Sequence, residues 1–111
     1  MRRWQGEDKG DFKSMDKLKQ IKQILEGQKE YLQEKYKIKE IGVFGSYVRG
    51  EQKKKSDVDI LVEFEEAPGL LTFMEIENYL SGILNIKVDL VIKDALKPVI
   101  GKHILKEVIN I

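Results

Sequence analysis

Apolar and polar residues follow two different periods along this chain, and the periods predict which segments are helices and which are strands. From Asp16 to Tyr36, apolar residues recur at helical spacing between charged ones, which predicts an amphipathic helix with Asp16 as its N-cap. Helical spacing returns after the Pro68-Gly69 break and again after Pro98, a residue that suits a first helical turn. The chain is therefore expected to form three main helices.

Three segments rich in apolar and β-branched residues lie between these helices and predict strands. They are residues 38–44, 57–64 and 87–92. The first two are joined by a short connection with room for one small helix, over 46–50, whereas a parallel crossover generally needs a longer helix. We therefore expect them to pair antiparallel. The expected fold class is α+β, a small mixed sheet of about three to four strands flanked by helices.

The candidate chemistry lies where the first predicted strand ends and the second begins. Gly45-Ser46 is followed, after ten intervening residues, by Asp57-Val58-Asp59. Side chains two apart on a strand share a face, so the two aspartates should project together. Mg²⁺ is usually held by one or two such carboxylates plus substrate phosphates, and backbone amides at a helix start bind anions. The spacing favours metal-dependent chemistry on a nucleoside triphosphate, although an ordinary turn and a strand-end aspartate would also fit.

Asp89 is the candidate third carboxylate. It lies inside the β-branched run 87–92, and an isolated aspartate in a buried strand is costly unless it is paired or binds a cation. Phosphoryl transfer with two metals also needs ligands from more than one strand. The alternative is an aspartate that faces solvent from an edge strand.

These residues resemble the minimal nucleotidyltransferases, small relatives of the DNA polymerase β superfamily. The hallmark of that family is Gly-Ser, ten residues, then Asp-x-Asp, and this chain matches it without a gap. The residues around the motif are also similar, with Val48 where alanine is usual and Ile60 where leucine is common. The resemblance covers roughly residue 38 to the C-terminus, and it implies the nucleotidyltransferase fold.

The resemblance also implies roles for the residues of the motif. The catalytic carboxylates, which would also hold two Mg²⁺ ions, are Asp57, Asp59 and Asp89. Asp89 would in addition receive the proton of the acceptor. The triphosphate would lie against Gly45 and Ser46. Arg49 is a further candidate for phosphate binding, because a guanidinium suits phosphate bidentately, but a surface arginine paired with an acid is an equal alternative.

Family members of this size typically act as antitoxins encoded beside a HEPN-domain toxin. The resemblance therefore implies transfer of AMP from ATP to a tyrosine hydroxyl of that partner. Only about twenty residues follow Asp89, so the acceptor must be held by another chain or by an open cleft. Two alternatives remain. One is a small-molecule nucleotidyltransferase of the aminoglycoside-modifying type, which could share its acceptor site between the chains of a homo-oligomer. The other is an antitoxin that masks its toxin without chemistry.

Composition narrows the class of protein further. The 111 residues hold 20 basic and 19 acidic side chains, a net charge of +1 that provides no net attraction to nucleic acid or membrane. Cysteine is absent, which excludes disulfides and thiolate metal sites. No segment has the apolar length of a membrane span or a signal-peptide core, so we expect a cytoplasmic protein. Residues 1–15 lack a sustained period and are expected to be a flexible tail, with 16–111 forming the nucleotidyltransferase domain.

Overall fold

Helices and strands alternate along the chain, as the pattern of apolar residues predicts. The computed structural model describes residues 13–53 and 56–111. The elements are α1 (Lys13–Tyr36), β1 (Ile38–Phe44), α2 (Ser46–Arg49), β2 (Val58–Phe64), α3 (Leu70–Leu84), β3 (Val88–Ile92), the 3₁₀ turn η3 (Lys93–Ala95), α4 (Pro98–Glu107) and β4 (Ile109–Asn110).

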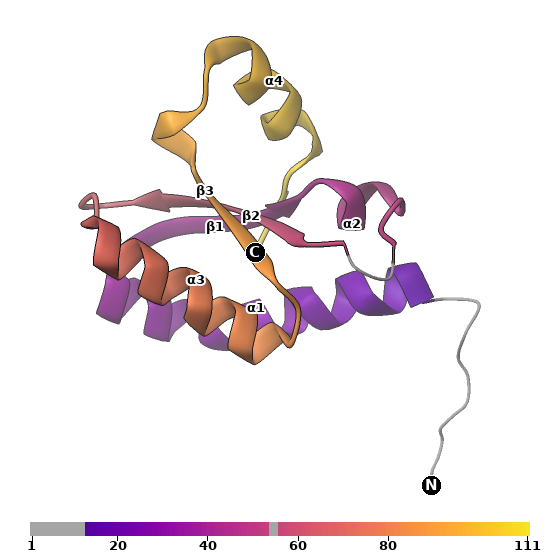
Figure 1. The fold of residues 1–111 in the computed structure, drawn as a ribbon, viewed down its shortest axis with the longest axis horizontal. Coiled ribbons are helices and arrows are strands. Elements are labelled where there is room, and N and C mark those ends of the chain that lie inside the picture. The colour runs from indigo at the N-terminus through magenta and orange to yellow at the C-terminus, as the bar shows by residue number, and fades with distance from the viewer. Residues whose placement is uncertain (1–12, 54–55) are drawn as a thin grey trace, which may run out of the picture.

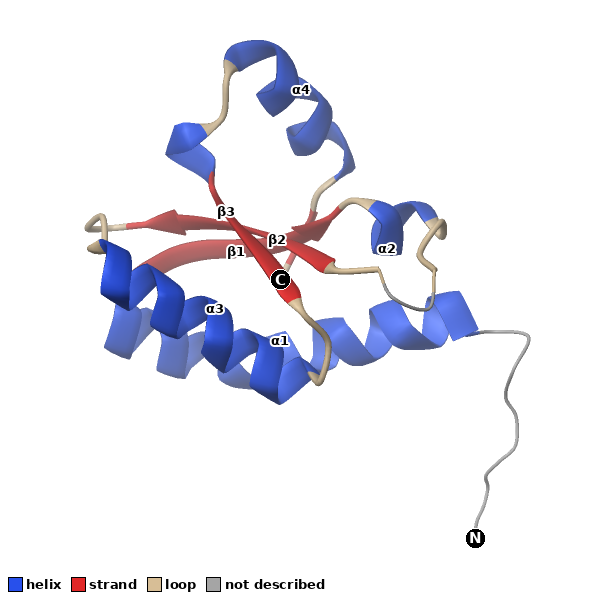
Figure 2. Ribbon diagram, viewed as in Figure 1, coloured by secondary structure: helices blue, strands red, loops and turns tan. Residues whose placement is uncertain are grey.

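The four strands form one mixed sheet in the order β3-β2-β1-β4. Strand β1 pairs antiparallel with β2 and β4, whereas β2 and β3 are parallel. The α+β fold class and the antiparallel relation of the first two predicted strands are therefore confirmed. Figure 2 shows the sheet in red between its helices.

Helices α1 and α3 pack against each other and against one side of the sheet, while α4 arches over the other side (Figure 1). The core lies between the sheet and the helices α1 and α3. Fully buried side chains recur at helical spacing on α1 and α3, namely Ile21, Leu25, Leu32, Ile76 and Leu80. Burial of each such side chain stabilises the fold by about 1.5–3 kcal/mol, so this layer gives the sheet a rigid support.

The N-terminal end of the fold differs from the prediction. Helix α1 begins at Lys13, so Asp16 lies within the helix and its assignment as N-cap is wrong. An N-cap residue has a non-helical backbone, whereas Asp16 follows three helical residues, of which Lys13 and Met15 have good helix propensity. Residues 13–15 of the predicted tail thus belong to α1, and residues 1–12 lie outside the described part of the chain.

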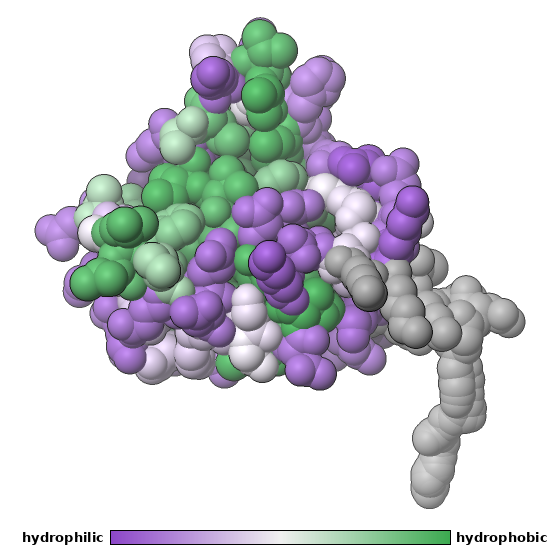
Figure 3. Space-filling view, viewed as in Figure 1, coloured by the Kyte–Doolittle hydropathy of each residue, from purple (hydrophilic) through white to green (hydrophobic). Residues whose placement is uncertain are grey.

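Helix α4 begins at Pro98, as expected, and its apolar side chains lie outside the buried core cluster. Ile100 is 54% exposed, and Val108 follows the last helical residue as C-cap. The only residue of α4 that is buried is Gly101. Figure 3 shows apolar side chains gathered over α4 and near the start of α3. Strand β4, which was not predicted, is two residues long and too short to show a period.

None of the helices in the described ranges is both long enough and apolar enough to cross a bilayer.

Candidate active site

The predicted site residues meet at one end of the sheet, where β1 ends and both β2 and β3 begin. Phe44 is the register partner of Asp59 on β2, and Asp59 is the register partner of Asp89 on β3. Asp57 lies one residue before β2. Antiparallel pairing of β1 with β2, together with parallel pairing of β2 with β3, thus brings the Gly-Ser turn and the aspartates to the same edge.

Gly45 brings the backbone of the turn directly against the carboxylate of Asp59. A Cβ atom at Gly45 would lie 2.9 Å from Cγ of Asp59 and 3.1 Å from its Cβ, and Gly45 has φ of +85°. A side chain would therefore meet both a steric clash and a left-handed backbone, and glycine avoids both. The Gly45 carbonyl accepts hydrogen bonds from the N–H groups of Val48 at 3.0 Å and Arg49 at 3.1 Å, which starts α2.

The connector after the turn is held by its own side chains. Ser46, the first residue of α2, is half-buried, and its N–H has no intrahelical acceptor because it lies in the first turn. Tyr47 is buried and its hydroxyl donates to the Ser56 carbonyl at 3.4 Å. The Lys53 N–H in turn donates to Oγ of Ser56 at 2.7 Å, which closes the turn before β2.

The carboxylates act on one another electrostatically. Asp59 is half-buried, whereas Asp57 is exposed. Burial, which is the largest cause, and the negative charges of Asp89 and Asp57 together raise the pKa of Asp59 from 3.8 to about 6, against the opposing positive charge of Arg49. Burial also raises the pKa of Tyr47, and the negative charge of Asp57 contributes to this rise.

Asp89 lies in a different environment from the one predicted. It is exposed, because β3 is the edge strand of the sheet and has a neighbour on one side only. Asp89 thus faces solvent from an edge strand, as in the alternative, while Val88 and Leu90 on the opposite face of β3 are buried. Asp89 is nevertheless level with Asp59 in the sheet, and its charge raises the pKa of Asp59.

The oxygen donors suit a hard cation in their chemistry. All three side chains offer only carboxylate oxygens, the ligands that Mg²⁺ prefers, and a cation would relieve the repulsion that raises the pKa of Asp59. Over residues 13–53 and 56–111, no group of three His, Cys, Asp or Glu side chains is already gathered as a metal centre.

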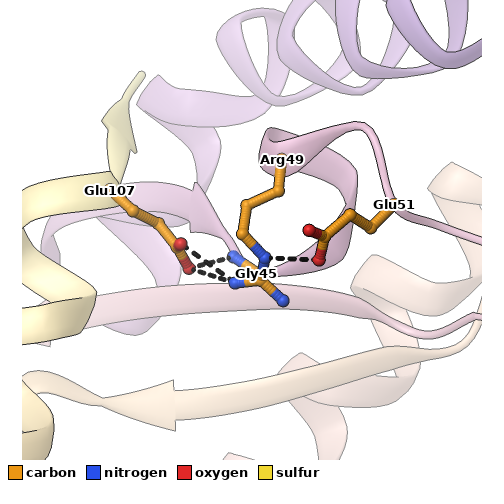
Figure 4. A network of polar contacts seen from close by, with 4 residues as sticks. All are labelled: Gly45, Arg49, Glu51 and Glu107. Carbon is orange, nitrogen blue, oxygen red and sulfur yellow. Dashed lines mark hydrogen bonds and ion pairs between the residues drawn. The ribbon is translucent and has the colours of Figure 1, made fainter.

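Arg49 is bound by two acidic side chains, which agrees with the alternative that it is a surface arginine paired with an acid. Its Nε donates to Oε1 of Glu51 at 2.8 Å, and its Nη1 donates to Oε1 and Oε2 of Glu107 at 2.9 and 3.0 Å. The N–H of Gly45 donates to the same Glu107 carboxylate at 2.8 Å (Figure 4). The last residue of α4 is thus bonded to both the turn and the arginine.

A cavity of about 410 Å³ lies between the turn and α4. It is lined by Phe44, Gly45, Arg49, Asp59, Ile100, His103, Ile104 and Glu107. The four lining residues that belong to α4 are spaced three or four apart and form one face of that helix, namely Ile100, His103, Ile104 and Glu107. The sequence prediction did not include these residues in the site, because helical spacing shows that one face of a helix is apolar but not what that face meets. One signal was present: Glu107 is an acid in the last turn of a helix, where the helix dipole disfavours negative charge.

Residues 25–111 match the family model described as nucleotidyltransferase domain. The match includes the Gly-Ser turn and all three aspartates of the site. The chain therefore belongs to the nucleotidyltransferase family, as one of its minimal members.

Individual relatives are similar over most of the chain. The protein adenylyltransferase MntA of Thermococcus cleftensis is 54% identical over 94 residues, which cover 85% of this chain and 95% of that protein. A crystal structure of a toxin-antitoxin with AMP-PNP has a chain that is 26% identical, with a TM-score of 0.62 over 81% of this chain and 68% of that one. The same fold, at 21% identity and a TM-score of 0.56, occurs in the structure of a tri-AMPylated Shewanella oneidensis HEPN toxin in complex with MNT antitoxin, over 87% of this chain and 70% of that one.

Proposed function

We propose that this nucleotidyltransferase is an antitoxin that transfers AMP from ATP to a tyrosine hydroxyl of a HEPN-domain partner, in a Mg²⁺-dependent reaction. The observation that carries the proposal is the close approach of the Gly45 backbone to Asp59, which brings the Gly45-Ser46 turn beside the carboxylates. The 54% identity to a protein adenylyltransferase supports the AMP transfer. The relative crystallised in a toxin-antitoxin with AMP-PNP supports both the nucleotide and the kind of partner.

Asp57, Asp59 and Asp89 would hold Mg²⁺, which when bound neutralises phosphate charge and lowers the pKa of an attacking hydroxyl. The remaining groups of the site would hold the triphosphate. Gly45 and Ser46 offer backbone N–H groups and the Ser46 hydroxyl, and Arg49, which lines the cavity beside Gly45, offers a guanidinium. Phosphoryl transfer asks a protein mainly for such positioning and charge neutralisation.

In the transfer step, the acceptor oxygen would form a bond to the α-phosphorus while the bond from that phosphorus to the bridging oxygen breaks. Pyrophosphate leaves, and AMP remains attached to the acceptor. The acceptor hydroxyl loses its proton to a carboxylate, and we assign this role to Asp89. Asp89 is exposed on the edge strand, where a side chain from a bound protein can approach it.

The experiment is incubation of this chain with the product of the neighbouring gene, ATP labelled at the α-phosphate, and Mg²⁺. We expect label on a tyrosine of the partner, and we expect Asp57→Asn or a chelator to abolish the labelling. Asp94→Asn, at an exposed aspartate of η3, is the matched control and should label normally.

Two outcomes would contradict the proposal. Neutralisation of the toxin by the Asp57→Asn variant, with no label transferred, would favour an antitoxin that acts by binding alone. Label on an aminoglycoside but not on the partner would favour a small-molecule nucleotidyltransferase.

A further inference from the structure

Glu107, the last residue of α4, takes two hydrogen-bond donors of the proposed triphosphate site. Its Oε2 accepts the Gly45 N–H at 2.8 Å, and both of its oxygens accept from Nη1 of Arg49, at 2.9 and 3.0 Å (Figure 4). The Glu107 side chain is 24% exposed, so this pair is better shielded from water than the 64% exposed Glu51 that also binds Arg49. A carboxylate thus lies where a phosphate oxygen would be bound.

The stability of α4 does not explain an acid at this position. The last carbonyl groups of a helix carry partial negative charge, so a carboxylate there is repelled. The bonds to Gly45 and Arg49 offset that repulsion, and they join residues 62 and 58 positions apart in the chain. The position of Glu107 is therefore determined by the site rather than by its own helix.

We propose that Glu107 is an internal competitor of the triphosphate, and that nucleotide binding releases its carboxylate from Gly45 and Arg49. Because it takes these two residues as phosphate donors, this inference rests on the proposed function. Gly45 has a single N–H, which cannot donate a full-strength bond to Glu107 and to a phosphate oxygen at once. A carboxylate and a phosphate beside the same guanidinium would also repel each other.

Release of the Glu107 carboxylate would disturb few packing contacts, because α4 lies outside the core. Gly101 is its only buried residue, and none of its side chains belongs to the buried core cluster among the described residues. Its C-terminal end leads into β4, which pairs with β1 at Gly42 and Val43. The end of α4 is thereby kept near the site, and displacement of the Glu107 side chain requires no loss of core contacts.

Competition of this kind lowers the apparent affinity by the fraction of molecules in which the donors are available. If Glu107 holds its donors in about 70–90% of molecules, its removal should tighten nucleotide binding by about three- to tenfold. The test is the Kd of Mg²⁺·AMP-PNP for the full chain, measured by isothermal titration calorimetry. Glu107→Gln keeps the size of the side chain without its charge, and Glu107→Ala removes the acceptor.

The matched control is Glu51→Gln. Glu51 also binds Arg49, through Nε at 2.8 Å, but it does not bind the Gly45 N–H. We expect both Glu107 variants to bind AMP-PNP about three- to tenfold more tightly than wild type, and Glu51→Gln to lie within about twofold. The amide resonance of Gly45 provides a readout without nucleotide: it should shift in Glu107→Ala and stay unchanged in Glu51→Gln.

Three results would overturn the inference. Unchanged or weaker AMP-PNP binding by folded Glu107 variants, with normal binding by wild type, would mean that Glu107 positions Arg49 for the substrate instead of competing with it. An unchanged Gly45 amide resonance in Glu107→Ala would mean that the contact does not form. Absence of AMP-PNP binding in wild type and all variants would overturn the proposed function, and the inference with it.

Discussion

Asp59→Asn is expected to stabilise the fold in the absence of metal while it abolishes AMP transfer. The carboxylate of Asp59 is half-buried against the backbone of Gly45. Burial and the charges of Asp89 and Asp57 raise its pKa from 3.8 to about 6. Asparagine has nearly the same shape and keeps the polar character of the side chain, but it carries no charge to be repelled.

The direction of the change in stability caused by Asp59→Asn follows from proton linkage. A carboxyl whose pKa is higher in the folded chain than in the unfolded chain binds its proton more tightly when folded, so ionisation destabilises the fold. A rise from 3.8 to about 6 corresponds to at most about 3 kcal/mol at 1.36 kcal/mol per pKa unit. Asp59 is partly exposed, and solvent screening reduces this to about 1–2 kcal/mol. The loss of stability caused by ionised Asp59 is absent below the pKa of the unfolded chain. It grows as the pH rises through the interval from 3.8 to about 6, and it is constant above that interval.

The assay is urea denaturation of wild type and variant in a chelating buffer, at several values of pH from about 4 to 8. The difference in free energy of unfolding should grow across the lower part of this range and reach about 1–2 kcal/mol in favour of Asp59→Asn at neutral pH. Asp94→Asn, at an exposed position whose charge is not among those that act on Asp59, should show no such growth. Equal stability at neutral pH, or a difference that does not vary with pH, would refute the charge-repulsion account.

Three further predictions test the site and its support. Added Mg²⁺ should raise the midpoint of thermal unfolding of wild type, and raise that of Asp59→Asn much less, because a ligand stabilises only the fold that binds it. Gly45→Ala should lower the free energy of unfolding, measured in urea, by about 2–4 kcal/mol, because it combines the clash with Asp59 and a left-handed backbone. Gly50→Ala has a left-handed backbone but no atom within 4 Å of the new Cβ, so it should cost only about 1–2 kcal/mol. Leu25→Ala in the core should cost about 2–5 kcal/mol, while Leu71→Ala, 81% exposed, should stay within about 0.5 kcal/mol.

The order and type of the main elements could be predicted from the sequence, because local signals determine them. Helix α3 begins after Gly69, as the Pro68-Gly69 break indicates, and ends before Asn85, whose φ of 56° terminates it. The antiparallel pairing of β1 and β2 followed from the short connection between them. The meeting of Gly45 with Asp59 follows from this pairing alone.

The environment of Asp89 and the place of α4 could not be predicted in the same way. A β-branched run does not show whether its strand has one neighbour or two, and β3 has one. The helical period of Ile100 and Ile104 likewise shows that one face of α4 is apolar, but not whether that face meets the core or a cavity. Both features depend on contacts between residues far apart in the chain, such as that of Glu107 with Gly45.

The charges of the site lead to one further prediction, which concerns the metal and the nucleotide together. At a pH well above its pKa of about 6, Asp59 is an ionised carboxylate that lines the cavity proposed to receive the triphosphate. Without Mg²⁺ it repels the nucleotide, and with Mg²⁺ it attracts it through the cation. AMP-PNP should therefore bind Asp59→Asn more tightly than wild type in a chelator and more weakly in Mg²⁺, by about fivefold in each case if one unit charge contributes about 1 kcal/mol at a hydrated site. Calorimetric titrations under both conditions measure this reversal. The same order of affinities with and without the metal would show that Asp59 does not hold a cation between itself and the nucleotide.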